Sequence, residues 1–349
     1  MTSSHFDFLI SGQGLAGSLL SWQLIKHGRR VLVVDPCSTS TSSRVAAGLI
    51  HPVTGRRIVK TWRADEFIPF AVKTYREIED QLGEIFFEEY PVFEIFHDIK
   101  HLNDWLGRSA DEGMSGYYGG ECGPESVPGG VIAPYGGCWI LNGGWLNTQR
   151  FLDALRNQLK NRSCFLQDEI NPREITFSQA GIEWKNIRAS TFIDCTGYNY
   201  MKNSHEGQSL FNPCKGELLK ISMKGFPSDI VIHGNINIIP LGGWMYLAGS
   251  TYDFNNVDNG ATPSALKKLT EEISRVARPS FEVLEHHAAI RPSTADRRPL
   301  IGPVPKSRGH YVFNGLGSKG VMLAPWMAEH LAGHLINESP LDSEFSLSR

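Results

Sequence analysis

The chain opens on a pattern that restricts its fold more than any other: an apolar strand, three spaced glycines and a helix. The apolar run covers residues 6–11, the glycines are Gly12, Gly14 and Gly17, and an amphipathic run covers residues 18–27. In this order the first glycine permits a tight turn, the second lets a pyrophosphate approach the backbone, and the third lets helix and strand pack closely. The helix N-terminus would present N–H groups and a positive dipole end to the phosphates.

A second strand completes this unit. Residues 31–34 are apolar and are followed by Asp35. Its distance from Gly17 is close to the spacing of about 20 residues at which an acid binds the ribose 2′-OH of a dinucleotide. A glycine-rich turn in some other α/β protein is the alternative, but the whole strand–helix–strand–acid order favours a dinucleotide site.

Composition and charge exclude several classes of protein. The 349 residues are 41% hydrophobic and 20% charged, and the formal net charge is −3, which gives no electrostatic reason to expect a nucleic-acid partner. The six cysteines are scattered without C-x-x-C spacing, so we expect neither a disulfide framework nor a metal site. No apolar run approaches the ~20 residues of a membrane span, and the start lacks the features of a signal peptide. We expect a cytoplasmic protein with reduced thiols and no membrane association.

Two further segments are suited to contact a bound cofactor. After Asp35 come small polar residues and then small apolar ones, whose backbone amides and hydroxyls could wrap a ligand; a flexible surface loop is the alternative. Residues 190–194 predict an apolar strand that ends in a small-residue turn, and it resembles the strand that returns the chain to the nucleotide domain in flavoproteins with two dinucleotide-binding folds. The candidate cofactor contacts of these segments are Pro36, Ser42, Ser43, Arg44, Ala46, Ala47, Gly48, Cys195, Thr196 and Gly197.

The end of the chain repeats the opening arrangement. Residues 311–314 predict a strand, Gly315, Gly317 and Gly320 are spaced as before, and an amphipathic helix runs to about residue 336. A second nucleotide site would need a following strand and an acid, for which little chain remains. We therefore expect this helix to address the other end of the same cofactor. A helix N-terminus and a cation such as Lys319 would stabilise the negative charge of a reduced flavin; a purely structural helix is the alternative.

With both ends read, the sequence resembles the D-amino-acid oxidase-like family of FAD-dependent oxidoreductases, which includes glycine and sarcosine oxidases. The opening unit carries one part of the resemblance, Ala289-Ile290-Arg291-Pro292 with Asp296 carries a second, and the run 315–325 carries a third. The closing run looks closest to the oxidase half of the bifunctional enzyme that modifies the tRNA wobble uridine. That enzyme's pattern has Arg where this chain has Lys319.

The resemblance implies roles for particular residues. Arg291 would hold a substrate carboxylate through a bidentate contact; an ion pair with Asp296 is the alternative. Some relatives attach flavin to a cysteine shortly after the Arg-Pro segment, but residues 293–302 contain none, so we expect non-covalent FAD. His51 could approach the flavin, although a structural role is at least as good a reading. With Arg291 and Lys319 as candidate catalytic residues, the cofactor contacts also include Leu15, Ala16, Ile170, Ser318 and Val321.

The expected fold class is α/β (α+β overall), with a Rossmann-like FAD-binding domain and a second, mainly antiparallel-sheet substrate domain. Both glycine-rich helices must reach one cofactor, so the FAD-binding domain should be discontinuous. Its segments would be residues 1–60, 146–210 and 290–349, leaving residues 61–145 and 211–289 for the substrate domain.

The expected activity is oxidation of a C–N bond of an amino acid or secondary amine. A hydride would pass to flavin N5, the imine would hydrolyse, and O2 is a candidate electron acceptor. No general base is required if the amine binds neutral. Two alternatives stay open: a tRNA-modifying oxidase acting on a carboxymethylaminomethyl group, and a non-catalytic flavin-binding module. The sequence indicates no oligomeric state.

Overall fold

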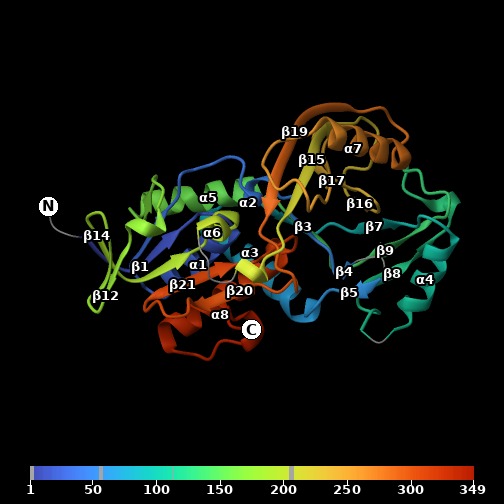
Figure 1. The fold of residues 1–349 in the computed structure, drawn as a ribbon. Coiled ribbons are helices and arrows are strands. Elements are labelled where there is room, and N and C mark those ends of the chain that lie inside the picture. Colours follow the sequence, from blue (N-terminus) through green and yellow to red (C-terminus); the bar gives the residue numbers. More distant parts are fainter. Residues whose placement is uncertain (1–3, 55–57, 112, 204–207) are drawn as a thin grey trace.

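The structure is a computed structural model that describes residues 4–54, 58–111, 113–203 and 208–349. Two lobes lie side by side, each built on its own sheet (Figure 1). Among the described residues, no helix is both long and apolar enough to span a bilayer.

The sheet of the first lobe has eight strands drawn from distant parts of the chain. Five of its strands are parallel, in the order β11-β2-β1-β14-β21. The other three pair antiparallel: β13 with β14, β12 with β13, and β20 with β21. The strands are β1 (Ser4–Ser11), β2 (Val31–Val34), β11 (Phe165–Leu166), β12 (Thr176–Ser178), β13 (Gly181–Trp184), β14 (Ile187–Asp194), β20 (Leu300–Pro303) and β21 (His310–Asn314).

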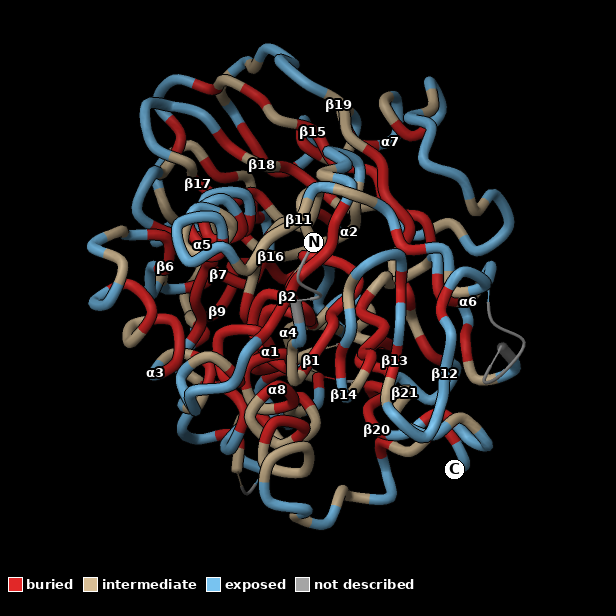
Figure 2. The backbone as a smooth tube through the Cα atoms, turned by 90° about the vertical axis from the view of Figure 1, so that its left-hand side faces the viewer, coloured by how far each residue is buried: buried red, intermediate tan, exposed pale blue. Residues whose placement is uncertain are grey.

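The central strands and the helices against them form the core of this lobe (Figure 2). All four residues of β2 are buried, as the continuous apolar runs of parallel strands require. Helix α1 (Leu15–Lys26) packs between α8 (Gly320–Asn337) and α5 (Thr148–Asn161). The prediction that this helix is amphipathic, with one side exposed, was therefore wrong in part. Residues 15–24 are all buried, because neighbouring helices and the sheet enclose them.

The sheet of the second lobe also has eight strands, in the order β19-β15-β18-β17-β16-β7-β9-β8. All pairs are antiparallel except β16 with β7. The strands are β7 (Val92–Ile95), β8 (Tyr118–Cys122), β9 (Gly137–Ile140), β15 (Cys214–Ser222), β16 (Val231–His233), β17 (Asn237–Gly242), β18 (Met245–Gly249) and β19 (Glu282–Arg291). Helices α4 (Ile99–Ser109) and α7 (Pro263–Val276) belong to this lobe (Figure 1).

One long helix and several short elements lie outside the two large sheets. Helix α3 (Ala64–Leu82) packs against α8 and ends at Gly83, whose φ of 64° is typical of a left-handed helix cap. Its side chains Phe70 and Leu82 are only partly buried. The remaining elements are the helices α2 (Ser42–Val45) and α6 (Tyr198–Asn203) and two small sheets, one of β3 (Leu49–Ile50), β10 (Gly144–Leu146) and β6 (Phe87–Glu88), the other of β4 (Val53–Thr54) and β5 (Val59–Lys60).

Candidate active site

Two adjoining cavities lie where the ends of β1 and β14 meet the second sheet. The larger holds about 1440 Å³ of empty space, part of it open to solvent, and is lined by both glycine-rich segments and by residues of the second sheet. The smaller holds about 1000 Å³, also partly open to solvent, and is lined by Asp35 and the polar loop that follows it. The cavities share the wall residues Gly14, Ser42, Ser43, Cys195 and Gly197.

The opening glycines have no room for side chains. A Cβ on Gly12 would lie 2.7 Å from the carbonyl oxygen of Cys195, and one on Gly17 would lie 1.9 Å from the carbonyl oxygen of Gly12. A Cβ on Gly14 would lie 2.8 Å from Ser43 Oγ, which itself accepts a hydrogen bond from Leu15 N at 3.1 Å. This cradle lets a ligand approach the backbone at the N-terminus of α1, which fits the pyrophosphate of a dinucleotide.

Asp35 lies at the wall of the smaller cavity and is 8% exposed. Its Oδ2 accepts from Gln13 N and its Oδ1 from Cys37 N, each at 2.7 Å. Arg156 Nη2 is 3.5 Å from Oδ1. The carboxylate therefore orders the glycine turn, and each oxygen keeps acceptor capacity for a further donor such as a ribose hydroxyl.

Most of the predicted cofactor contacts line one of the two cavities, and three do not. Gly17 packs against the turn at Gly12 instead. Arg44 extends to Asp153, with 2.5 Å between Nη2 and Oδ1. Gly315 lies against strand β20, where a Cβ would be 3.0 Å from Leu300 N. These three residues therefore lie behind the cavity wall, where they pack against or hold the residues that line it.

Arg291, at the end of β19, lines the larger cavity. Its Nη1 donates to Thr251 O at 3.2 Å and its Nη2 to Ser250 Oγ at 2.5 Å, and the guanidinium lies 4.6 Å from the centre of the Tyr252 ring. Gly216 makes room for it, since a Cβ there would lie 2.1 Å from Nη2. Nothing in the local sequence assigns Gly216 a role beside Arg291, because the two residues adjoin only through the pairing of β15 with β19.

The ion pair between Arg291 and Asp296 is not formed. Asp296 is instead bound by Arg349, with 2.7 Å between Nε and Oδ2. Arg291 therefore keeps N–H groups for an anion in the cavity, because its acceptors Thr251 O, Ser250 Oγ and, at 3.8 Å, Cys214 Sγ engage only part of the five-donor guanidinium.

Lys319 caps α8 and also lines the larger cavity. Its Nζ donates to Thr61 Oγ1 at 3.1 Å and to the carbonyl oxygen of His51 at 3.4 Å. Desolvation, with a smaller repulsion from Arg297, lowers the pKa of Lys319 to about 8. A negative charge placed in the cavity would be stabilised by this ammonium and by the helix end behind it.

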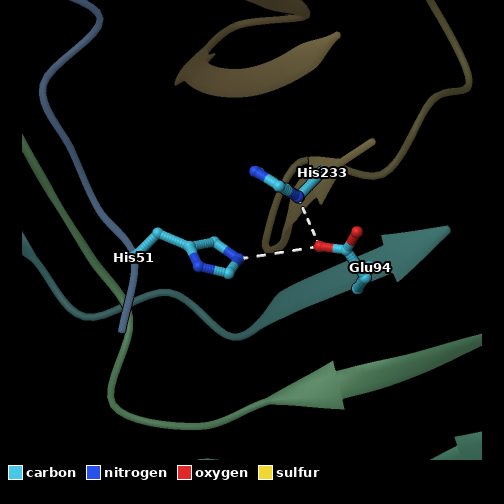
Figure 3. A group of neighbouring side chains, drawn as sticks. All are labelled: His51, Glu94 and His233. Carbon is cyan, nitrogen blue, oxygen red and sulfur yellow. Dashed lines mark hydrogen bonds and ion pairs between the residues drawn. The ribbon is translucent and has the colours of Figure 1, made fainter. Parts of the chain in front are cut away.

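His51, Glu94 and His233 come together from three separate segments (Figure 3), and the two histidines line the same cavity. Glu94 Oε2 is hydrogen-bonded to His233 Nδ1 and lies 3.7 Å from His51 Nε2. The two imidazole rings are 4.2 Å apart. Burial, with repulsion from His233 and Lys319, holds the pKa of His51 well below its ordinary value.

Sequence reasoning singled out only His51 of this group. Glu94 and His233 face each other because β7 and β16 pair in parallel with these residues in register. No local spacing in the sequence indicates that pairing. The group of His51, Glu94 and His233 could therefore not be identified without the fold.

Comparison with known proteins decides the family. The sequence matches the family described as FAD dependent oxidoreductase (DAO) over residues 7–334. The chain belongs to this family. It is an FAD-dependent oxidoreductase, and the glycine cradle and the two adjoining cavities fit the cofactor that the family implies.

Curated relatives include the tRNA 5-methylaminomethyl-2-thiouridine biosynthesis bifunctional protein MnmC of Leptospira borgpetersenii serovar Hardjo-bovis (strain JB197), 23% identical over 97% of this chain and 58% of the relative. The protein of the same name from Legionella pneumophila (strain Corby) is 24% identical over 97% of this chain and 55% of the relative. The chain thus spans a little over half the length of these relatives.

Solved structures share the fold. Glycine oxidase from Bacillus cereus ATCC 14579 is 18% identical over 96% of each chain, with a TM-score of 0.82. Iminodiacetate oxidase from Chelativorans sp. BNC1 is 17% identical over 97% of this chain and 98% of its own, with a TM-score of 0.81.

Proposed function

We propose that this FAD-dependent oxidoreductase oxidises a C–N bond of a small carboxylated amine, an amino acid or an N-substituted amino acid. The observation that carries the proposal is Arg291, whose guanidinium keeps unused N–H donors on the wall of the larger cavity, which the N-terminus of α8 also lines. Neighbours of the same fold act on glycine and on iminodiacetate according to their names, and these compounds carry the carboxylate that a planar guanidinium binds best.

FAD held in the two cavities would supply the hydride acceptor. The residues of the chain then bind and orient. Arg291 fixes the substrate carboxylate, Lys319 and the N-terminus of α8 stabilise negative charge, and the cradle at Gly14 receives the pyrophosphate. Holding the substrate in one geometry is the main catalytic contribution that such a site needs from the protein.

We propose that FAD is bound without a covalent link. Residues 293–302, where some relatives attach flavin, contain no cysteine. Cys195 lines both cavities, but burial and the neighbouring Asp194 raise its thiol pKa well above the ordinary value. A protonated thiol is a poor nucleophile, so Cys195 is unsuited to form a flavin bond.

The sheets also support a division into two domains, which we propose with its predicted boundaries. Residues 1–60, 146–210 and 290–349 would bind FAD, because they supply the strands of the first sheet. Residues 61–145 and 211–289 would carry the substrate domain, because they supply nearly all of the second sheet.

The test compares matched pairs of amines that differ only in the carboxylate, such as glycine with methylamine and sarcosine with dimethylamine. Purified protein is incubated with each under air, and the carbonyl product is measured after imine hydrolysis. Oxidation of the carboxylated member alone is expected. Equal oxidation of both members would contradict a role for Arg291 in carboxylate binding.

A second candidate is a tRNA-modifying oxidase that acts on a carboxymethylaminomethyl group. The curated relatives favour it, since they carry that name and align with nearly the whole chain. This substrate also contains a carboxylate beside a secondary amine, so Arg291 would suit it. Two measurements distinguish the candidates. The second would be established if the protein bound tRNA in a salt-dependent manner and oxidised the group on the tRNA, but oxidised no free amino acid.

A further inference from the structure

We propose that His233, held in place by Glu94, accepts the proton of the substrate ammonium group before the C–N bond is oxidised. The inference rests on the proposed function and adds a residue to it. It starts from the group of His51, Glu94 and His233 (Figure 3), whose two histidines line the cavity that Arg291 also lines.

The first step concerns the tautomer of His233. The buried carboxylate of Glu94 accepts a hydrogen bond from Nδ1 of His233, and an ionised carboxylate can only accept. Nδ1 therefore carries the proton, and the lone pair of the ring is on Nε2, which is turned away from Glu94 (Figure 3). The His233 side chain is 26% exposed whereas that of Glu94 is 6% exposed, so the ring is open to the cavity while its partner is covered.

The second step concerns charge. A proton taken up at Nε2 makes His233 an imidazolium, which the Glu94 carboxylate stabilises at hydrogen-bond distance, as in the carboxylate–histidine pairs of hydrolases. His51 does not compete for this role. Its Nδ1 accepts from Val53 N at 3.1 Å, and burial keeps the ring neutral by lowering its pKa.

The same geometry argues against a metal ion on these three residues. With Nδ1 of His51 accepting from a backbone N–H, the proton of the neutral ring is on Nε2, the nitrogen that faces Glu94. A metal bound there would need Nε2 deprotonated and would displace the hydrogen bond between Glu94 and His233. His51 instead directs an N–H toward the Glu94 carboxylate from the opposite side.

The chemistry follows from the protonation state of the substrate. An amino acid bound through its carboxylate to Arg291 carries an ammonium group at neutral pH, and its carbon can release a hydride only when the nitrogen has a free electron pair. The N–H bond breaks, its electron pair stays on the substrate nitrogen, and the proton bonds to Nε2 of His233, directly or through one water. The flavin that the family employs would accept the hydride, which would leave the substrate as a protonated imine that water hydrolyses.

The titratable and charged groups around His233 and Glu94 come from several elements. They are His51 before β4, Glu94 on β7, His97 and His101 at the start of α4, Cys138 on β9 and Lys319 at the start of α8. Among these described groups, Glu94 alone is hydrogen-bonded to the His233 ring.

The experiment measures kcat/KM against pH for two carboxylated secondary amines, one of which carries an electron-withdrawing trifluoroethyl group that lowers the pKa of its nitrogen. If His233 is the acceptor, the rise of kcat/KM with pH reports the ionisation of a protein group. Its midpoint is then the same for both substrates. In His233→Asn, which keeps a donor for Glu94 but cannot hold a proton, the midpoint should follow the substrate nitrogen. The rate at neutral pH should fall on the order of 10²-fold.

Glu94→Gln should lower kcat while KM for the carboxylated substrate stays close to that of the wild type. His27→Asn, the same substitution at the exposed residue that follows α1, is the matched control and should leave the profile unchanged. FAD content and melting temperature report whether each variant is folded.

A wild-type midpoint that moves with the substrate nitrogen, or an unchanged profile in His233→Asn, would overturn the inference and leave the proposed function standing. Oxidation of neither amine at any pH would overturn both. One equivalent of a divalent metal in the purified protein, lost in His233→Asn together with activity, would assign the group to a metal and would also overturn the inference.

Discussion

Replacing Arg291 by Ala should weaken the binding of a carboxylated substrate and leave FAD bound. The guanidinium is already oriented by Ser250 and Thr251 and keeps further N–H groups for the carboxylate. Loss of a charge-assisted bidentate pair costs about 2–5 kcal/mol. Since the Arg291 side chain is only partly buried, solvent screening favours the lower part of this range.

A loss of about 2–3 kcal/mol corresponds to an increase in KM of roughly 30- to 150-fold. The assay is steady-state oxidation of the best carboxylated amine and of its counterpart without the carboxylate. Arg291→Lys should recover only part of the loss, because an ammonium keeps the charge but not the planar fork. Arg162→Ala, at an exposed position beyond α5, is the matched control. Equal changes in KM for both amines, or loss of FAD from Arg291→Ala, would refute the reasoning and give Arg291 a structural role.

Three other predictions concern Lys319 and the flavin. Lys319→Met should lower the flavin midpoint potential by about 20–45 mV, equivalent to ~1–2 kcal/mol, and weaken sulfite binding; unchanged values in redox and sulfite titrations would contradict the role of this cation. The pKa of about 8 for Lys319 lies below its ordinary 10.5, so the folded apoprotein binds fewer protons than the unfolded chain between these values. Lys319 should therefore increase the unfolding free energy of the apoprotein as the pH rises through this window. Urea titrations at pH 7 and 9 should show this increase in the wild type and not in Lys319→Met. Acid precipitation should release all the flavin into the supernatant, whereas colour in the pellet would show a covalent link.

The local parts of the site could be predicted from the sequence. The glycines at 12, 14 and 17 act through the turn in which they stand, and a Cβ at Gly17 would collide with the carbonyl oxygen of Gly12. Because such requirements involve only a few neighbouring residues, their spacing in the sequence reports them directly. The mainly antiparallel sheet expected for the second domain is also present in the structure.

The parts that depend on long-range pairing could not be predicted. Glu94 meets His233 only because β7 and β16 lie in parallel register, and Gly216 makes room for Arg291 only because β15 lies beside β19. The burial of α1 on all sides was missed for the same reason, since α8, which covers it, comes from the other end of the chain.

The most direct test of the central claim is anaerobic mixing of the yellow protein with a panel of amino acids, N-alkyl amino acids and the matching amines. Loss of the flavin absorbance near its visible maximum would be followed in time. We expect rapid loss with at least one carboxylated amine and none with the partner that lacks the carboxylate. A flavin that keeps its colour with every member of the panel, while chemical reduction still bleaches it, would contradict the account and favour a flavin-binding protein without this activity.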